Sequence, residues 1–128
     1  MTPSLDDRLA LHELIARYGH IIDGGDYSIL DQIFTDDAVF ELIGLPGGRC
    51  DGLPAIIDMM EASTSHPLAH HASNIVIESD DNTIRVLSKG LGVGRGGRVG
   101  SVVYRDVVIK GGRGWRIIER VCELRGAS

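Results

Sequence analysis

Three polar side chains on or beside apolar stretches of the sequence could transfer protons: Tyr18, Asp23 and His70. Burying such a side chain costs free energy unless a hydrogen bond or a function compensates for it. An imidazole suits proton transfer near neutral pH, and a carboxylate against one ring nitrogen fixes its tautomer and stabilises its charged form. A tyrosine hydroxyl can donate a hydrogen bond to an oxygen that gains negative charge. The trio is therefore a candidate for general acid–base catalysis.

The first two residues of this trio also have structural interpretations. Tyr18 lies on the apolar stripe of the first predicted helix. At such a position a core tyrosine with a hydrogen-bonded hydroxyl is more frequent than a catalytic one. Asp23 would end the same helix, and the negative end of the helix dipole disfavours a carboxylate there. An aspartate beside Gly24-Gly25 is also an ordinary exposed turn residue. A catalytic Asp23 therefore needs a partner from elsewhere in the chain.

The histidine doublet starts a predicted strand, so His70 and His71 point to opposite faces of a sheet. Asn74 shares the parity of His70, whereas Ile75 and Ile77 share that of His71. Alternation thus leaves the choice between the two histidines open, and a bulge could shift the register. A satisfied structural histidine is as frequent as a catalytic one at such a position.

Other chemical motifs are absent from the sequence. The run Gly92–Gly97 precedes a predicted strand instead of opening a helix, which argues against a phosphate loop. Cys50 and Cys122 are far apart and lack the CxxC or Cys/His spacing of a metal site, so we expect reduced thiols, no metal and no cofactor. Three further histidines lack comparable context and are expected on the surface: His12, His20 and His66.

Length and composition predict a single domain over residues 1–128, since 43% of the residues are hydrophobic and one core is expected at this size. The net charge of -5 argues against a nucleic-acid partner. No apolar run approaches the ~18 residues of a membrane span, so a cytoplasmic protein with no membrane contact is expected. Four arginines near the end are interpreted as a solvated sheet edge: Arg113, Arg116, Arg120 and Arg125.

Three helices are predicted in the first half of the chain. Residues 4–23 follow the 3.6-residue apolar period, and Ser4 with Asp7 resembles a capping box at their start. A short second helix is predicted over Tyr27–Phe34. The third, over Leu53–Ala62, tolerates a proline in its first turn.

Strands dominate the second half. A strand is predicted over Ala38–Ile43, followed by a loop over Gly44–Gly52. After the third helix come four strands separated by turn signals: Leu68–Glu78, Thr83–Gly92, Arg98–Ile109 and Trp115–Leu124. Helices followed by a long antiparallel meander predict an α+β domain, with the helices on one face of a strongly curved sheet.

The order of these elements, with several short segments, resembles the SnoaL-like branch of the nuclear-transport-factor-2-like superfamily over nearly the whole chain. The segments are Tyr18-x4-Asp23, Phe34–Phe40, Asp51-Gly52, His70-x3-Asn74, Tyr104-x-Asp106 and Gly114–Ile117. The resemblance implies a cone-shaped, mostly antiparallel sheet that encloses one deep pocket with the three helices. It also implies an Asp–His pair at Asp23 and His70, which favours His70 over His71, and a catalytic tyrosine at Tyr18.

The resemblance further implies a cofactor-independent dehydratase, other lyase or isomerase acting on a small apolar cyclic or polyketide-like substrate. The absence of an acid in Val86–Val93 weakens an aldol-cyclase assignment. The alternative is a non-catalytic small-molecule-binding or dimerisation module of the same fold. A homodimer through the outer sheet face is a family expectation that Val99, Val103 and Val107 would fit. The predicted pocket residues are Phe34, Phe40, Met59, Asn74 and Tyr104.

Overall fold

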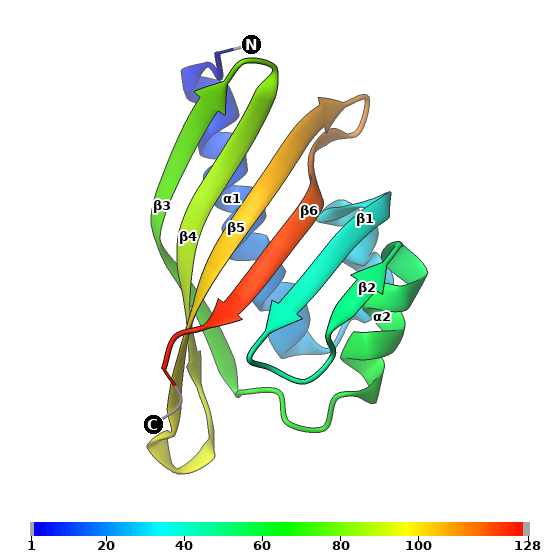
Figure 1. Ribbon diagram of the computed structural model, residues 1–128, viewed down its shortest axis with the longest axis vertical. Helices are drawn as coiled ribbons and strands as arrows, with labels where there is room; N and C mark the ends of the chain where they lie inside the picture. Colours follow the sequence, from blue (N-terminus) through cyan, green and yellow to red (C-terminus); the bar gives the residue numbers. More distant parts are fainter. Residues whose placement is uncertain (1, 127–128) are drawn as a thin grey trace.

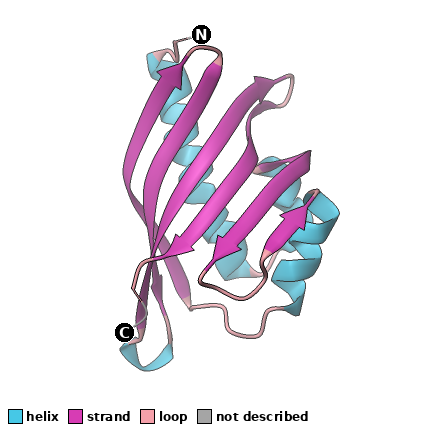
Figure 2. Ribbon diagram, in the orientation of Figure 1, coloured by secondary structure: helices cyan, strands magenta, loops and turns pink. Residues whose placement is uncertain are grey.

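A six-stranded sheet forms one layer of the protein, and helices cover one of its faces (Figures 1 and 2). The computed structural model describes residues 2–126. In chain order the elements are α1 (Leu5–Gly24), the 3-10 helix η1 (Tyr27–Gln32), β1 (Phe34–Ile43), β2 (Arg49–Asp51), α2 (Leu53–Ala62), β3 (Ala69–Asp80), β4 (Thr83–Val93), the short 3-10 helix η2 (Arg95–Gly97), β5 (Val99–Gly111) and β6 (Gly114–Leu124).

The sheet is mixed, with the strand order β2-β1-β6-β5-β4-β3. Neighbouring strands of the described chain are antiparallel except β1 and β6, which run parallel. Helix α1 lies across the sheet and packs against β3, while α2 packs against β1 and η1 (Figure 1). The predicted α+β cone, a curved and mostly antiparallel sheet under three N-terminal helices, is confirmed.

Helix α1 begins at the predicted capping box. The Ser4 hydroxyl accepts a hydrogen bond from the Asp7 amide at 3.1 Å, and the Asp7 carboxylate accepts one from the Ser4 amide at 3.0 Å. Asp7 also accepts from Lys110 Nζ and Trp115 Nε1, which tie the helix to β5 and β6. The hydrogen bond from the Ser4 backbone, then those from Lys110 and Trp115, lower the pKa of Asp7 well below its ordinary value. Gly25, with φ of 69°, ends the helix in a left-handed cap.

The segment after α1 departs from the sequence-based prediction. The predicted helix Tyr27–Phe34 is a 3-10 helix over Tyr27–Gln32, with a kink at Ile29, whose φ of -101° and ψ of 15° are not helical. Strand β1 then starts at Phe34, four residues before the predicted Ala38. Its pairing register with β6 shifts between Phe34 and Val39. The predicted loop contains the short strand β2, whose buried Cys50 pairs with Phe40. Tertiary pairing overrides local propensity in this region.

A bulge in β3 sets which of its side chains face the helices. Ser73 pairs with Lys89 and Val76 with Leu87, so β3 carries one extra residue between these pairs. Asn74 takes the left-handed conformation there, with φ of 54°, which asparagine tolerates better than most residues. The extra residue reverses the alternation, so both His70, before the bulge, and Ile77, after it, face the helices. This bulge removes the conflict between the two parities.

Candidate active site

A cavity of about 680 Å³ opens between the helices and the curved end of the sheet. A volume of this size is typical of pockets for small organic ligands. Its wall is mostly apolar, with hydroxyl, imidazole and guanidinium groups at intervals. The lining residues are Tyr18, Ile22, Phe40, Leu42, Leu45, Pro46, Met59, Met60, Ser63, Thr64, Ser65, His66, Pro67, His70, Gly90, Leu91, Gly92, Gly94, Arg95, Arg98, Val99, Gly100, Val102, Tyr104, Cys122 and Leu124.

Asp23 and His70 meet at the edge of this cavity. The Asp23 Oδ1 atom lies 2.6 Å from His70 Nδ1, and both carboxylate oxygens accept from the His70 backbone amide, at 3.0 and 3.1 Å. The His70 side chain is 19% exposed and that of Asp23 is 24% exposed. His70 lines the cavity whereas Asp23 lies behind it. Since Asp23 occupies Nδ1, Nε2 is the ring nitrogen left for a ligand.

A close approach of α1 to β3 makes this contact geometrically possible. A Cβ at Gly19 would lie 3.1 Å from the His70 carbonyl oxygen and 3.4 Å from its Cβ, closer than most real contacts. Asp23 is one helical turn further along the same face of α1. The Asp23 carboxylate can therefore lie at the C-terminal end of α1, where the helix dipole disfavours it, because the His70 backbone amide and ring Nδ1 hydrogen-bond to it. Sequence reasoning paired the two residues but did not identify Gly19.

Tyr18 lies beside the pair, at the floor of the cavity. Its ring centroid is 6.5 Å from that of His70 and 5.9 Å from that of Tyr104. Burial raises the pKa of Tyr18 well above its ordinary value, and burial also raises the pKa of Tyr104 to about 12. Burial raises the pKa of the Cys122 thiol to about 11. All three side chains are therefore neutral near pH 7 and can act as hydrogen-bond donors.

A buried ion pair under the two tyrosines was missed by sequence reasoning. Arg120 Nε donates to Asp106 Oδ1 at 2.7 Å and Nη2 donates to Oδ2 at 2.8 Å. The guanidinium carbon lies 4.4 Å from the centre of the Tyr18 ring and 4.0 Å from that of Tyr104. Burial lowers the pKa of Arg120, but the charge of Asp106 outweighs this effect and raises it above its ordinary value.

This ion pair corrects the interpretation of Arg120 as part of a solvated sheet edge. Its side chain is 1% exposed, because a bulge in β6 opposite Val107 and Val108 turns it toward the helices. The sequence contained one usable signal, since Tyr104 and Asp106 share a parity on a predicted strand. Nothing in the sequence paired that strand with Arg120 in this register.

The predicted pocket residues divide into two groups. Phe40, Met59 and Tyr104 line the cavity, as predicted. Phe34 and Asn74 do not line it. Phe34 is buried beneath Tyr18 and Phe40, with ring centroids 6.1 and 5.8 Å away. Asn74 is an exposed bulge residue whose Oδ1 accepts from Ser73.

Two further features of the cavity wall were missed or left open. His66, expected on the surface, lines the cavity, and its Nε2 lies 2.9 Å from the Met60 carbonyl oxygen. Gly90 lies against the Tyr104 ring, where an added Cβ would come within 2.4 Å of a ring carbon. Gly90 thus leaves room for Tyr104 on the sheet face, which explains one glycine of that glycine-rich stretch.

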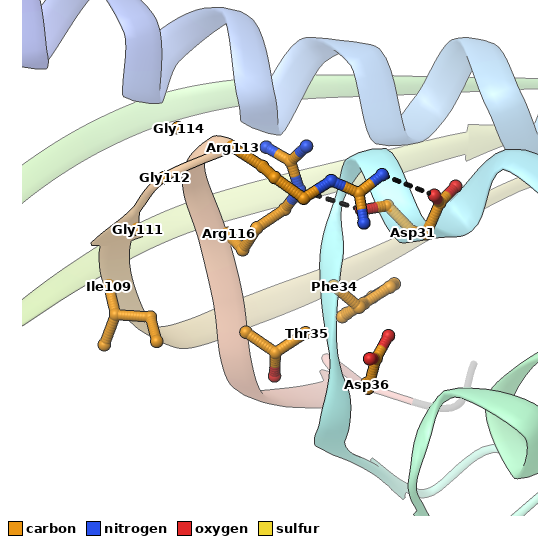
Figure 3. Close-up of a pocket in the computed structure, with 10 residues that line it drawn as sticks. All are labelled: Asp31, Phe34, Thr35, Asp36, Ile109, Gly111, Gly112, Arg113, Gly114 and Arg116. Atoms are coloured by element: carbon orange, nitrogen blue, oxygen red, sulfur yellow. Dashed lines mark hydrogen bonds and ion pairs between the residues drawn. The ribbon is translucent and has the colours of Figure 1, made fainter.

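A second, smaller cavity of about 220 Å³ lies at the other end of the sheet (Figure 3). Its charged side chains join the β5–β6 end of the sheet to η1. Arg113 Nη2 donates to Asp31 Oδ2 at 2.9 Å, and Arg116 Nε donates to the Asp31 carbonyl oxygen. Both arginines thus already donate hydrogen bonds to Asp31. This cavity is separate from the Asp23–His70 pair.

Residues 2–126 contain no group of three histidine, cysteine or acidic side chains arranged to hold a metal ion. None of the helices in that range has the length and apolar character needed to span a bilayer.

Comparison with known proteins was made by sequence family and by structure. The model of the SnoaL-like domain matches residues 3–121. A cystatin-like-fold protein of unknown function from Nostoc punctiforme superposes with a TM-score of 0.86 at 23% identity, covering 99% of this chain and 97% of its own. A proposed aromatic ring hydroxylase from Novosphingobium aromaticivorans gives 0.77 at 28% identity, covering 98% and 94%. A proposed scytalone dehydratase from that organism gives 0.72 at 18% identity, covering 96% and 89%. No curated protein matches the sequence significantly.

Proposed function

This chain belongs to the SnoaL-like family, and from that premise we propose that it is a cofactor-independent proton-transfer enzyme, a dehydratase, other lyase or isomerase. Its substrate would be a small, apolar, cyclic or polyketide-like molecule. The observation that carries the proposal is the 2.6 Å contact between Asp23 and His70 at the wall of a cavity large enough for such a molecule.

Each polar group has a distinct part in the proposed mechanism. Asp23 would accept a hydrogen bond from the Nδ1–H group of His70, which leaves the Nε2 lone pair on the ligand side. His70 would remove a proton from a carbon next to a carbonyl group, and Asp23 would stabilise the resulting imidazolium. The imidazolium would then return that proton, to the hydroxide that leaves as the β C–O bond breaks in a dehydration, or to a second carbon in an isomerisation. Tyr18, neutral and buried, would donate a hydrogen bond to the oxygen that becomes negative.

The known structures of similar fold are compatible with this reaction class. The neighbour described as a proposed scytalone dehydratase shares the fold at 18% identity. A likeness of that degree concerns the fold, so the reaction rests on the residues of this chain.

The experiment uses two probes that need only a base and a hydrogen-bond donor. Exchange of the α-protons of 2-tetralone in D2O, followed by NMR, measures proton abstraction. Loss of water from 3-hydroxy-1-tetralone, followed by naphthol fluorescence, measures elimination. Asp23→Asn and His70→Ala should each slow the accelerated reaction by about 10²–10⁴-fold, the usual contribution of a general base.

The neighbouring imidazole provides a matched control. His71 is exposed and lies on the opposite side of β3, so His71→Ala removes the same group without touching the cavity. It should retain the wild-type rate. Equal rates in His70→Ala and His71→Ala would refute the mechanism, and saturable binding of both probes without turnover would favour a binding module.

The assembly state is a separate proposal. We propose a homodimer through the outer face of the sheet, where Val76 and Leu87 are 49% and 42% exposed and Val103 and Val107 are half-buried. Singly exposed apolar residues are ordinary, but several on one sheet face favour a partner. A monomeric mass in light scattering at micromolar concentration would refute it.

A further inference from the structure

The charge of the large cavity is opposite to that of the whole protein. The chain has 18 acidic and 13 basic residues. None of the residues that line the cavity is acidic, whereas Arg95, Arg98, His66 and His70 all line it. A wall with cationic groups and no carboxylate favours an anionic ligand, because both the field and the hydrogen-bond donors suit it.

The two arginines come from the hairpin between β4 and β5. Arg95 begins η2 and Arg98 follows it, and the hairpin is closed by a hydrogen bond from the Gly94 amide to the Arg98 carbonyl at 2.7 Å. Both side chains are exposed, and neither guanidinium has an ion-pair or hydrogen-bond partner within residues 2–126. Three other exposed arginines are paired with carboxylates, namely Arg49, Arg105 and Arg113. Within residues 2–126, Arg8, Arg17, Arg85 and Arg125 are exposed and unpaired like Arg95 and Arg98, but they do not line the cavity.

The loop after α2 supplies hydroxyl groups to the same cavity. Ser63, Thr64 and Ser65 line it directly before His66. Figure 1 shows this loop and the β4–β5 hairpin at the same end of the molecule, below the sheet. Hydroxyl and guanidinium groups around one opening can together donate several hydrogen bonds to an oxyanion.

The sheet register gives the spacing between this opening and the Asp23–His70 pair. His70 pairs with Gly92 near the end of β4, and the hairpin starts at Gly94, two residues beyond Gly92. At about 3.3 Å per residue, the arginines lie roughly 7–10 Å beyond His70 along the strand. Ile22, Phe40 and Val102 supply apolar wall elsewhere in the cavity. A ligand that contacts both the hairpin arginines and His70 therefore has an apolar body between its charged group and its reacting carbon.

We infer that Arg95 and Arg98 bind the oxyanion of an amphipathic substrate, a carboxylate or a phosphate, whose apolar body extends to His70. The assignment of His70 to the reacting end rests on the proposed function. The binding of the anion at the hairpin does not, so the two can fail separately.

Two fluorescent probes with one skeleton isolate the charge. 8-Anilinonaphthalene-1-sulfonate carries an oxyanion, and N-phenyl-1-naphthylamine has the same rings without it. In Arg95→Gln/Arg98→Gln the affinity of the sulfonate should fall by about tenfold or more, as expected for loss of charge-assisted hydrogen bonds. The affinity of the neutral amine should stay within about twofold, because the apolar wall is unchanged.

A double variant elsewhere controls for net charge. Arg8 and Arg85 are exposed, and neither lines the cavity. Arg8→Gln/Arg85→Gln removes the same two charges and should leave the affinity of both probes unchanged. If both double variants weaken the sulfonate equally, or if neither does, the inference is wrong.

Competition against the bound sulfonate identifies the anion. 1-Naphthoate and 1-naphthyl phosphate share a ring with the neutral 1-naphthamide, so their displacement curves compare carboxylate, phosphate and amide directly. Stronger displacement by either anion supports the inference and names the group, whereas equal displacement by the amide overturns it. Asp23→Asn, which tests the proposed function, should leave this anion preference in place.

Discussion

Two pairs of a carboxylate and a basic side chain flank the Tyr18 ring, and they differ in burial and in hydrogen bonding. Asp23 and His70 keep 24% and 19% of their side-chain surface exposed and meet through one ring nitrogen. Asp106 and Arg120 are 0% and 1% exposed and are joined by two parallel hydrogen bonds. The first pair has a titratable partner with a free ring nitrogen, while the second has a cation that stays charged.

The difference shows how one cavity can combine rigidity with chemistry. The Asp106–Arg120 pair holds Tyr18 and Tyr104 in place by stacking, at 4.4 and 4.0 Å from their ring centres. The Arg120 guanidinium stays protonated at neutral pH, because burial lowers its pKa less than the charge of Asp106 raises it. This pair therefore does not transfer protons. The Asp23–His70 pair is partly exposed, and it is the pair that the proposed mechanism uses for proton transfer. We interpret the buried pair as the support and the open pair as the reacting group.

Breaking the buried pair should have the largest effect on stability. Arg120→Met leaves the Asp106 carboxylate buried and unpaired, which should cost about 3–5 kcal/mol of unfolding free energy. Urea denaturation followed by circular dichroism measures it. Arg105→Met, which breaks the exposed pair with Glu123 on the same two strands, should cost less than about 1 kcal/mol. Equal losses in the two variants would contradict the distinction between support and surface.

The double variant Arg120→Met/Asp106→Leu sharpens the same comparison. Replacing both charges with apolar side chains of similar volume removes the unpaired carboxylate, so most of the lost stability should return. Any remaining deficit measures the loss of stacking on Tyr18 and Tyr104. A double variant as unstable as Arg120→Met would show that packing, and not the unpaired charge, dominates.

The second-largest expected effect is a loss of folding stability at alkaline pH. Burial raises the pKa of Tyr104 from 10.0 to about 12, so between those values the unfolded chain releases a proton that the folded chain keeps. The contribution of Tyr104 to stability is therefore fully present below pH 10 and falls by about 2–3 kcal/mol as the pH rises to 12. Tyr104→Phe should remove this part of the pH dependence in urea denaturation series at pH 9 to 12, while Tyr18 and Cys122, whose pKa values burial also raises, account for the rest. An unchanged slope would show that Tyr104 titrates normally.

The sequence predicted most of the fold because its patterns are local. The helical period of residues 4–23, the Ser4–Asp7 capping box and the turn signals between strands determined the element order. The errors lie where pairing partners decide the structure. Strand β2 is three residues long and exists through its pairing with β1, and the start of β1 at Phe34 depends on β6.

The candidate site was predicted in part, for related reasons. The family resemblance pointed to Asp23 and His70, and the structure brings them into contact. The inward or outward orientation of the residues around them could not be predicted from the sequence alone. Asn74 reverses the alternation of β3 through a bulge, and Arg120 faces inward because of another bulge in β6. A bulge depends on the register of two strands, which a single strand's pattern does not contain.

The smallest expected effect tests the position of the open pair. Gly19→Ala places a methyl group 3.1 Å from the His70 carbonyl, so β3 must shift by a few tenths of an ångström from Asp23. The gain in helix propensity, about 1 kcal/mol, offsets the strain and should leave stability within about 1 kcal/mol of wild type. Turnover of the tetralone probes should nevertheless fall about tenfold, since general-base catalysis depends on alignment.

Gly24→Ala is the matched control for this effect. Gly24 belongs to the same helix, and an added Cβ there meets nothing within 4 Å. The substitution should therefore bring the propensity gain without moving β3, raising stability by up to about 1 kcal/mol and leaving turnover unchanged. If Gly19→Ala and Gly24→Ala have the same turnover, the close approach of α1 to β3 does not position the Asp23–His70 pair. A loss confined to Gly19→Ala would show that catalysis depends on a helix–strand distance that the buried pair does not control.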